Sequence, residues 1–475
     1  MTTMTLPRIT PIALLLGAIG GILAIIGFVV SLDLGLPWLM PVLMIGVGIL
    51  GAMFKRPQVW IGVYLFAMPY FLTDTGKGLS AAEVAIGGFF SVSIIVWLVW
   101  RMAVTRAPVI KTWADFLILL FIVLSGLNVI PALCNGVDPM SWTSEWILFF
   151  LMLYYFPIRE YFGKDEKSFR TFLLLCAISA LFMAIYSMFI YKQRMSAGLL
   201  YAYQLWSSRS VLLGPIFLLT IILSLIGIFH ARLRTKLALL FLLAVNGAAL
   251  LLTFTRTLWV FFVICMAIAM FFLRAGQNLR LIASGIAVCA AVFIGAMAYN
   301  PKLADIALTV VKNRISSSTQ LTGGDYSFET RLIEAEVAWR EIQQYPLGGS
   351  GIRSRILAWA PIEGWHNNTA FMHIGYVSLV YKVGFPTAIL MFVVLLVFSV
   401  MAIRNVWLIR RDSRAGPFFV VSVGMFCFLP AVFVNIFMTG FFDQRYGNVM
   451  FAFIFACIAI VHDHISQQHH NDNRI

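Results

Sequence analysis

Charged side chains are scarce in this sequence. Only 11% of the 475 residues are charged, whereas 61% are hydrophobic. A soluble globular domain carries roughly 25% charged residues, so the composition excludes an ordinary soluble protein. The apolar residues form continuous runs of about 18 or more positions, which is typical of transmembrane helices. They do not alternate with polar residues, as the strands of a membrane barrel do.

Cysteine and clustered acidic residues are also scarce. Five of the six cysteines lie inside apolar runs, and no pair has the spacing of metal ligands or of a disulfide framework. Between residues 300 and 368 the Asp and Glu residues are scattered. No Asp-x-Asp pair of the kind that holds Mg²⁺ or Mn²⁺ against a diphosphate occurs there. A diphosphate bound by this segment would need arginines to neutralise it.

The apolar runs predict an all-α fold, because backbone polar groups in lipid must be hydrogen-bonded within their own segment. We expect a polytopic transmembrane helix bundle of about 12–14 helices. A run over 236–273 is too long for one crossing, so we divide it near Thr253–Arg256. The candidate spans are 11–30, 37–53, 58–72, 81–100, 114–133, 143–158, 170–190, 211–230, 236–252, 257–273, 281–299, 384–403, 417–438 and 446–461.

The formal charge of +14 has an explanation in this topology. Lys and Arg gather in alternate connections, such as 101–111 and 159–170, which the positive-inside rule assigns to the cytoplasm. This distribution argues against nucleic acid as a partner. It divides the chain into transmembrane helices over 1–299, a long outward loop over 300–368, further transmembrane helices over 369–462 and a polar cytoplasmic tail over 463–475. We expect that tail to fray, with His462 and His464 solvated; metal binding by these two histidines is the alternative that we favour less.

Arg256, in "LLTFTRTLWVFF", lies between two apolar runs at the predicted outer face. A charge in this position is costly unless it faces a cavity or a partner. One interpretation is an arginine whose head reaches the headgroup layer. The other is an anion-binding group, because the planar guanidinium donates two parallel hydrogen bonds to a phosphate.

An amphipathic helix is predicted within "FETRLIEAEVAWREIQQYPLGGSG". Ala335, Ala338, Trp339 and Ile342 share one face, and Arg331 lies at the start. Pro346 ends the helix, and the glycines that follow form a turn. Gly349 allows a backbone to approach a ligand closely, but it is equally compatible with an ordinary loop.

His366, in "IEGWHNNTAFMH", stands at the border of the next apolar run. Imidazole accepts a proton near neutral pH, so a general base for a sugar hydroxyl is one role. An interfacial histidine packed by Trp365 is the other. We expect Asn367 and Asn368 to cap a helix that carries His366 and His373 on one face, with His373 packing or orienting.

The order of these motifs resembles the bacterial O-antigen ligase/O-antigen polymerase superfamily. The resemblance covers 256–386 and consists of an outer arginine in "TFTRTLW", a long loop with Arg331 and Trp339, then "PLGGSG", "HNNTAF" and "YKVGFP". The family usually has Ser-Arg where this chain has Thr255-Arg256. The resemblance implies an all-helical fold of the GT-C glycosyltransferase type in the bacterial inner membrane.

The resemblance also implies an activity, in which glycan moves from undecaprenyl diphosphate to an acceptor hydroxyl at the periplasmic face with inversion. His366 is then the base, and Arg256 and Arg331 bind the diphosphate. Arg209, Asn367, Gly349 and Trp339 are candidate substrate contacts. No metal or cofactor is implied. The partners are the lipid-linked glycan, membrane lipids, and a lipid A–core or polysaccharide acceptor.

Two questions stay open at the level of sequence. Ligase, polymerase and protein glycosylation differ only in the acceptor, which these residues do not identify. A polysaccharide or lipid-linked oligosaccharide transporter is the alternative from another class. Its supporting features would be charged or broken helices near mid-bilayer related by internal symmetry, and the sequence shows no repeat.

Overall fold

The structure is a computed structural model. It describes residues 55–72, 81–195, 213–280, 326–360, 365–409, 416–439 and 445–472, together with single positions between these ranges. The predicted spans at 11–30 and 37–53, and most of 281–299, lie outside the described residues.

The described residues form a helix bundle, which confirms the all-α, multi-pass fold class. Within them, seven helices are long and apolar enough to cross a membrane. The elements are α3 (Pro57–Leu72), α4 (Ala81–Val99), η1 (Trp100–Val104), α5 (Trp113–Leu127), α6 (Val129–Cys134), α7 (Pro139–Phe150), η2 (Leu151–Tyr154), α8 (Tyr155–Phe162), α9 (Glu166–Met195), α11 (Gly214–Ile228), α12 (Leu233–Leu252), α13 (Arg256–Met270), α16 (Tyr326–Gln344), β1 (Ile356–Ala360), β2 (Trp365–Thr369), α17 (Gly375–Ile409), α18 (Pro417–Met438) and α19 (Arg445–Asp472).

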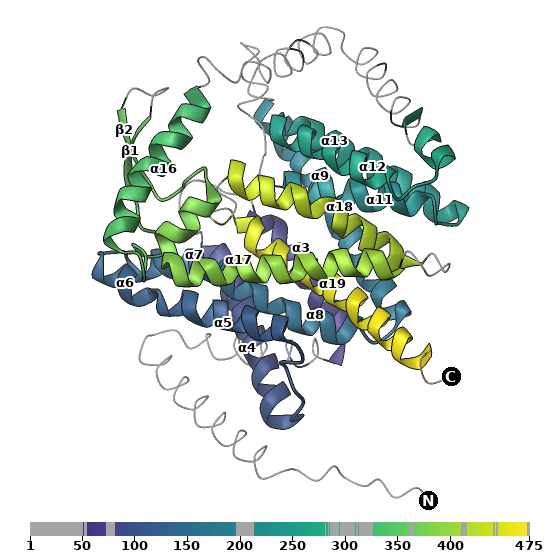
Figure 1. Ribbon diagram of the computed structural model, residues 1–475, viewed down its shortest axis with the longest axis horizontal. Helices are drawn as coiled ribbons and strands as arrows, with labels where there is room; N and C mark the ends of the chain where they lie inside the picture. The colour runs from purple at the N-terminus through teal and green to yellow at the C-terminus, as the bar shows by residue number, and fades with distance from the viewer. Residues whose placement is uncertain are drawn as a thin grey trace, which may run out of the picture.

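Helix α17 runs through the middle of the bundle and packs against α5, α16, α18 and α19. In Figure 1 it extends from the β-hairpin and α16 at one side of the molecule toward the C-terminus at the other. We call these two sides the hairpin end and the opposite end. The division of the 236–273 run is confirmed, since α12 ends at Leu252 and α13 begins at Arg256.

Aromatic side chains fill the core where α3, α4 and η2 meet. The rings of Tyr64 and Tyr154 stack with centroids 3.8 Å apart. The Tyr154 hydroxyl lies 2.6 Å from the Ser93 hydroxyl, and both side chains are fully buried. The polar tips therefore have partners inside the apolar layer, as buried hydroxyl groups require.

The expected helix through His366 and His373 is wrong. Residues Trp365–Thr369 form β2, which pairs antiparallel with β1 in the register Trp359↔His366 and Ala358↔Asn367. Asn367 and Asn368 are therefore strand residues and not helix caps. Helix α17 begins only at Gly375, so His373 precedes it.

The expectation of a frayed tail with His462 and His464 solvated is also wrong, since His462 is partly buried and its Nδ1 lies 3.0 Å from Oδ1 of Asn405. Helix α19 continues to Asp472. The His464 ring stacks on Phe418 with centroids 3.8 Å apart, and Ile465 is buried. These contacts hold the polar end of α19 against the start of α18.

Candidate active site

Helix α17 is broken close to the hairpin. Gly384 has φ 76° and ψ 167°, far from helical values. The glycine-rich turn between α16 and β1 bonds the backbone groups that the break exposes. The Ser350 amide donates to the Tyr381 carbonyl at 2.7 Å, and the Phe385 amide donates to the Pro346 carbonyl at 2.8 Å. Because buried backbone groups need partners, the turn and the kink stabilise each other.

Asn128, the residue that ends α5, joins the same assembly. Its Nδ2 donates to the carbonyls of Gly348 and Lys382, both at 2.8 Å. Its Oδ1 accepts the Ile352 amide at 2.7 Å. One buried side chain thus connects α5, the glycine-rich turn and the kinked helix. No pattern in the sequence indicates this role, because a lone Asn at a helix end is common.

A buried ion pair lies beneath the turn. The Lys382 ammonium donates to the Glu145 carboxylate of α7, and both side chains are at most 5% exposed. Arg353, whose side chain is 41% exposed, places Nη1 3.7 Å from the same carboxylate. Ionisable residues inside membrane helices usually pair and often mark functional regions. The sequence does show a lysine, Lys382, within an apolar run. It belongs to the motif "YKVGFP", but no role was predicted for it.

The second pair joins α16 to the segment before α17. The Glu334 side chain is 8% exposed, and its Oε2 lies 2.9 Å from Nδ1 of His373. The same oxygen accepts the His373 amide at 3.0 Å. The two residues are 39 positions apart, so periodicity could not associate them. Glu334 is buried, although it is not one of the apolar residues predicted to form the packed face of this helix.

Two predicted diphosphate ligands lie toward the hairpin end. Arg331 is on α16, in its second turn, with Nη1 4.0 Å from the sulfur of Met438 at the end of α18. Arg256 is the first residue of α13 and is partly exposed. Helix α13 packs on α18, and its far end contacts α18 through Phe272 and Phe426. Both the start of α13 and the end of α18 therefore point toward the hairpin end.

His366 lies on the outer face of the hairpin. Ile356 and Ala358 of β1 are buried, whereas Leu357 and Trp359 are 60% and 41% exposed. This alternation is that of a strand with one face packed, here against α16. His366 is paired with Trp359, is exposed, and contacts that ring edge-on at 5.3 Å between centroids.

The other predicted substrate contacts stay predictions. Trp339 is 49% exposed, with its ring edge-on to Phe385 at 6.2 Å. Gly349 is buried against the kink of α17 and has a left-handed backbone. Asn367 is placed only through its strand pairing, and Arg209 lies outside the described residues.

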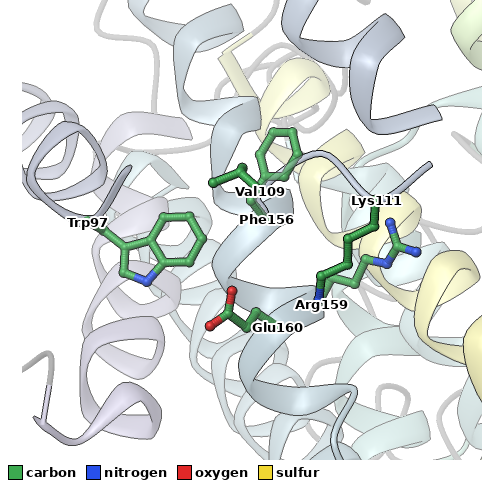
Figure 2. Close-up of a pocket in the computed structure, with 6 residues that line it drawn as sticks. All are labelled: Trp97, Val109, Lys111, Phe156, Arg159 and Glu160. Carbon is green, nitrogen blue, oxygen red and sulfur yellow. The ribbon is translucent and has the colours of Figure 1, made fainter. Parts of the chain in front are cut away.

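A small pocket at the opposite end is drawn in Figure 2 and includes Arg159 and Lys111 in its lining. The Arg159 guanidinium donates to both oxygens of Asp463 at 2.8 Å, and also to Asp115. Its donors are therefore occupied by carboxylates of α19 and α5. This cluster connects α5, α8 and α19 at the end away from the two histidines.

The fold and the contacts at the hairpin end define a class: a multi-pass, all-helical membrane protein. Polar residues at that end come from α13, α16, the hairpin and the segment before α17, as well as from α5, α7 and the glycine-rich turn. Within the described residues, these elements contribute Arg256, Arg331, two histidines and the buried carboxylate of Glu334.

Residues 237–392 match the sequence model of the O-antigen ligase family. The match includes Arg256, Arg331, His366 and His373, and it confirms the resemblance to the O-antigen ligase/polymerase superfamily. The matched residues are thus similar to a membrane glycosyltransferase of the O-antigen ligase type in the broad sense. A comparison with curated proteins found no match.

Proposed function

We propose that this protein transfers glycan from undecaprenyl diphosphate to an acceptor hydroxyl at the periplasmic face of the bacterial inner membrane. The observation that carries the proposal is the O-antigen ligase match over 237–392, which contains the arginines and histidines of the hairpin end. The acceptor is a lipid A–core sugar or a growing polysaccharide. Arg209, Asn367, Gly349 and Trp339 are proposed as contacts with these substrates.

Arg256 and Arg331 bind the diphosphate in this proposal. A cation in the first turn of a helix is not stabilised by the helix dipole, so the position of Arg256 favours a role outside helix stability. Arg331 approaches the end of α18, the helix on which α13 packs. Guanidinium groups suit this role because they donate paired hydrogen bonds to phosphate oxygens.

The geometry favours His373 over His366 as the base. The sequence-based prediction assigned this role to His366, which is exposed on the hairpin beside Trp359. His373 is held through its ring and its backbone by α16, the helix that also carries Arg331. A general base must keep a fixed position relative to the bound substrate, and the anchored ring meets that requirement better.

The transfer is a single displacement with inversion. The acceptor oxygen forms a bond to the anomeric carbon as the bond from that carbon to the diphosphate oxygen breaks. The acceptor proton passes to Nε2 of His373, and the bonding electrons leave with undecaprenyl diphosphate. Arg256 and Arg331 stabilise the negative charge that develops on the leaving group, commonly the largest electrostatic contribution to such catalysis.

The test reconstitutes the full chain in vesicles with an undecaprenyl-diphosphate oligosaccharide. Separate samples contain lipid A–core or only the lipid-linked chain as acceptor, and released undecaprenyl diphosphate is measured. We expect Arg256→Ala to slow release by about 10²-fold or more. His373→Ala should lose about 10²-fold or more in rate, whereas His366→Ala should lose less.

The outcomes separate the alternatives. Product on lipid A–core indicates a ligase, and longer lipid-linked chains indicate a polymerase. A larger loss in His366→Ala than in His373→Ala would restore the original assignment of the base. Movement of intact donor across the vesicle without release of undecaprenyl diphosphate would contradict glycan transfer and indicate a transporter.

A further inference from the structure

The carboxylate of Glu334 contacts both the ring and the backbone amide of His373. Glu334 Oε2 lies 2.9 Å from Nδ1 and Oε1 lies 3.2 Å from the same nitrogen. The amide of His373 also donates to Oε2, at 3.0 Å. The carboxylate thus fixes both the ring and the backbone of one residue, from a side chain that is itself 8% exposed.

This contact selects a tautomer. An ionised carboxylate accepts hydrogen bonds and cannot donate them, so Nδ1 of His373 must carry the proton that is shared with Glu334. The neutral imidazole then has its lone pair on Nε2. Within the described part of the chain, no hydrogen bond occupies Nε2, and the His373 side chain is 38% exposed. The proton-accepting nitrogen is therefore the one that can reach a substrate.

The same contact stabilises the positive charge that His373 would acquire as a base. When Nε2 takes a proton, the ring becomes an imidazolium beside a buried carboxylate. A charge-assisted hydrogen bond in a poorly solvated place is stronger than a neutral one. The ring need not rotate, because Nδ1 keeps its hydrogen bond to Glu334 when Nε2 gains the proton.

Helix α16 also relates this pair to the predicted phosphate site. Arg331 precedes Glu334 by one helical turn, and residues with this spacing are neighbours on a helix surface. Arg331 contacts Met438 of α18, and Glu334 contacts His373 before α17. One helix thus sets the separation between a cation and the base.

We propose that Glu334 is the positioning residue of this enzyme, which holds His373 in the Nδ1–H tautomer and stabilises its protonated form during transfer. The inference rests on the proposed function for the reaction itself. A purely structural pair would attach α16 to the start of α17 and would affect folding alone.

The experiment compares Glu334→Gln and Glu334→Asp with Glu336→Gln in reconstituted full-length protein. Glu336 is a matched control, because it lies on the same helix but is exposed and paired with Arg340. The substrate is the undecaprenyl-diphosphate oligosaccharide, and kcat and KM for this donor are measured separately. We expect Glu334→Gln to lower kcat by about 10²-fold with KM within about twofold, because its amide can donate to Nδ1 and favour the wrong tautomer. Glu334→Asp should restore part of kcat, and the control should stay within about twofold of wild type.

A spectroscopic measurement keeps the inference testable if the variants fold poorly. In protein labelled with ¹⁵N-histidine, the His373 signal is assigned by its loss in His373→Asn. We expect a protonated Nδ1 in the wild type and a shift toward protonated Nε2 in Glu334→Gln. A wild-type ring with protonated Nε2, or an unchanged kcat in Glu334→Gln, would overturn the inference. If His373→Ala keeps full activity, the proposed base itself fails; if it is inactive while Glu334→Gln is not, only the role of Glu334 fails.

Discussion

The packing of the glycine-rich turn predicts that substitution of Gly349 destabilises the protein. This residue has φ 70°, and a methyl group at its Cβ position would lie 2.6 Å from the Gly384 nitrogen and 2.6 Å from the Lys382 oxygen. Both atoms belong to the backbone of the α17 kink, which side-chain rotation cannot move. Gly349→Ala should therefore force the turn away from the kink.

Two contributions set the size of the effect. A left-handed backbone costs a residue with a Cβ about 1–2 kcal/mol. Forcing an extra methyl into a packed site costs about 1–3 kcal/mol more. The loss should thus reach about 2–5 kcal/mol, with the hydrogen bonds from the turn to Tyr381 and Lys382 weakened as well.

The assay is the apparent melting temperature of the purified protein in detergent, followed by intrinsic fluorescence. Gly348→Ala is the matched control, because its added methyl would meet only Pro131 at the ordinary distance of 3.5 Å. Gly349→Ala should melt well below wild type and Gly348→Ala close to it. Equal melting temperatures for the two variants would refute the argument that the turn and the kink pack backbone against backbone.

Two further predictions concern the buried ion pairs. Lys382→Met leaves Glu145 without its ammonium partner and should cost about 3–5 kcal/mol, seen as a lower melting temperature. Combining it with Glu145→Leu should recover most of the loss, and no recovery would contradict the pairing. At the opposite end, Asp463→Asn weakens the bidentate bond from Arg159 and should cost about 1–3 kcal/mol. Glycan release per folded molecule should stay unchanged in that variant, and a large fall in release would count against a structural role for this cluster.

The helices were predictable because a segment that crosses a lipid bilayer must be apolar and about 20 residues long. A run long enough to cross the bilayer must be helical, so α18 was predicted at its observed bounds and the break before Arg256 was located. The amphipathic α16 was also predictable, since Ala338 and Ile342 recur at helical spacing and are buried.

The hairpin and the paired side chains were not predictable on the same basis. Two five-residue strands outside the apolar runs leave a periodic signal too short to separate from a loop or a helix start. Glu334 and His373 meet only because α16 packs beside the start of α17, a tertiary relation that no local pattern records. For the same reason, the order of the motifs predicted His366 as the base, whereas the contacts in the structure favour His373 for that role.

Helix α5 is bonded to its surroundings at both of its ends. Asn128 bonds the backbone of the turn and the kink, and Asp115 bonds Tyr155 and Arg159 near the C-terminus. Sliding or rotating this helix would break contacts at both faces of the molecule at once. A substrate that displaces the glycine-rich turn would therefore either move α5, and with it the contacts of Asp115 at the opposite end, or break the bonds between the turn and Asn128.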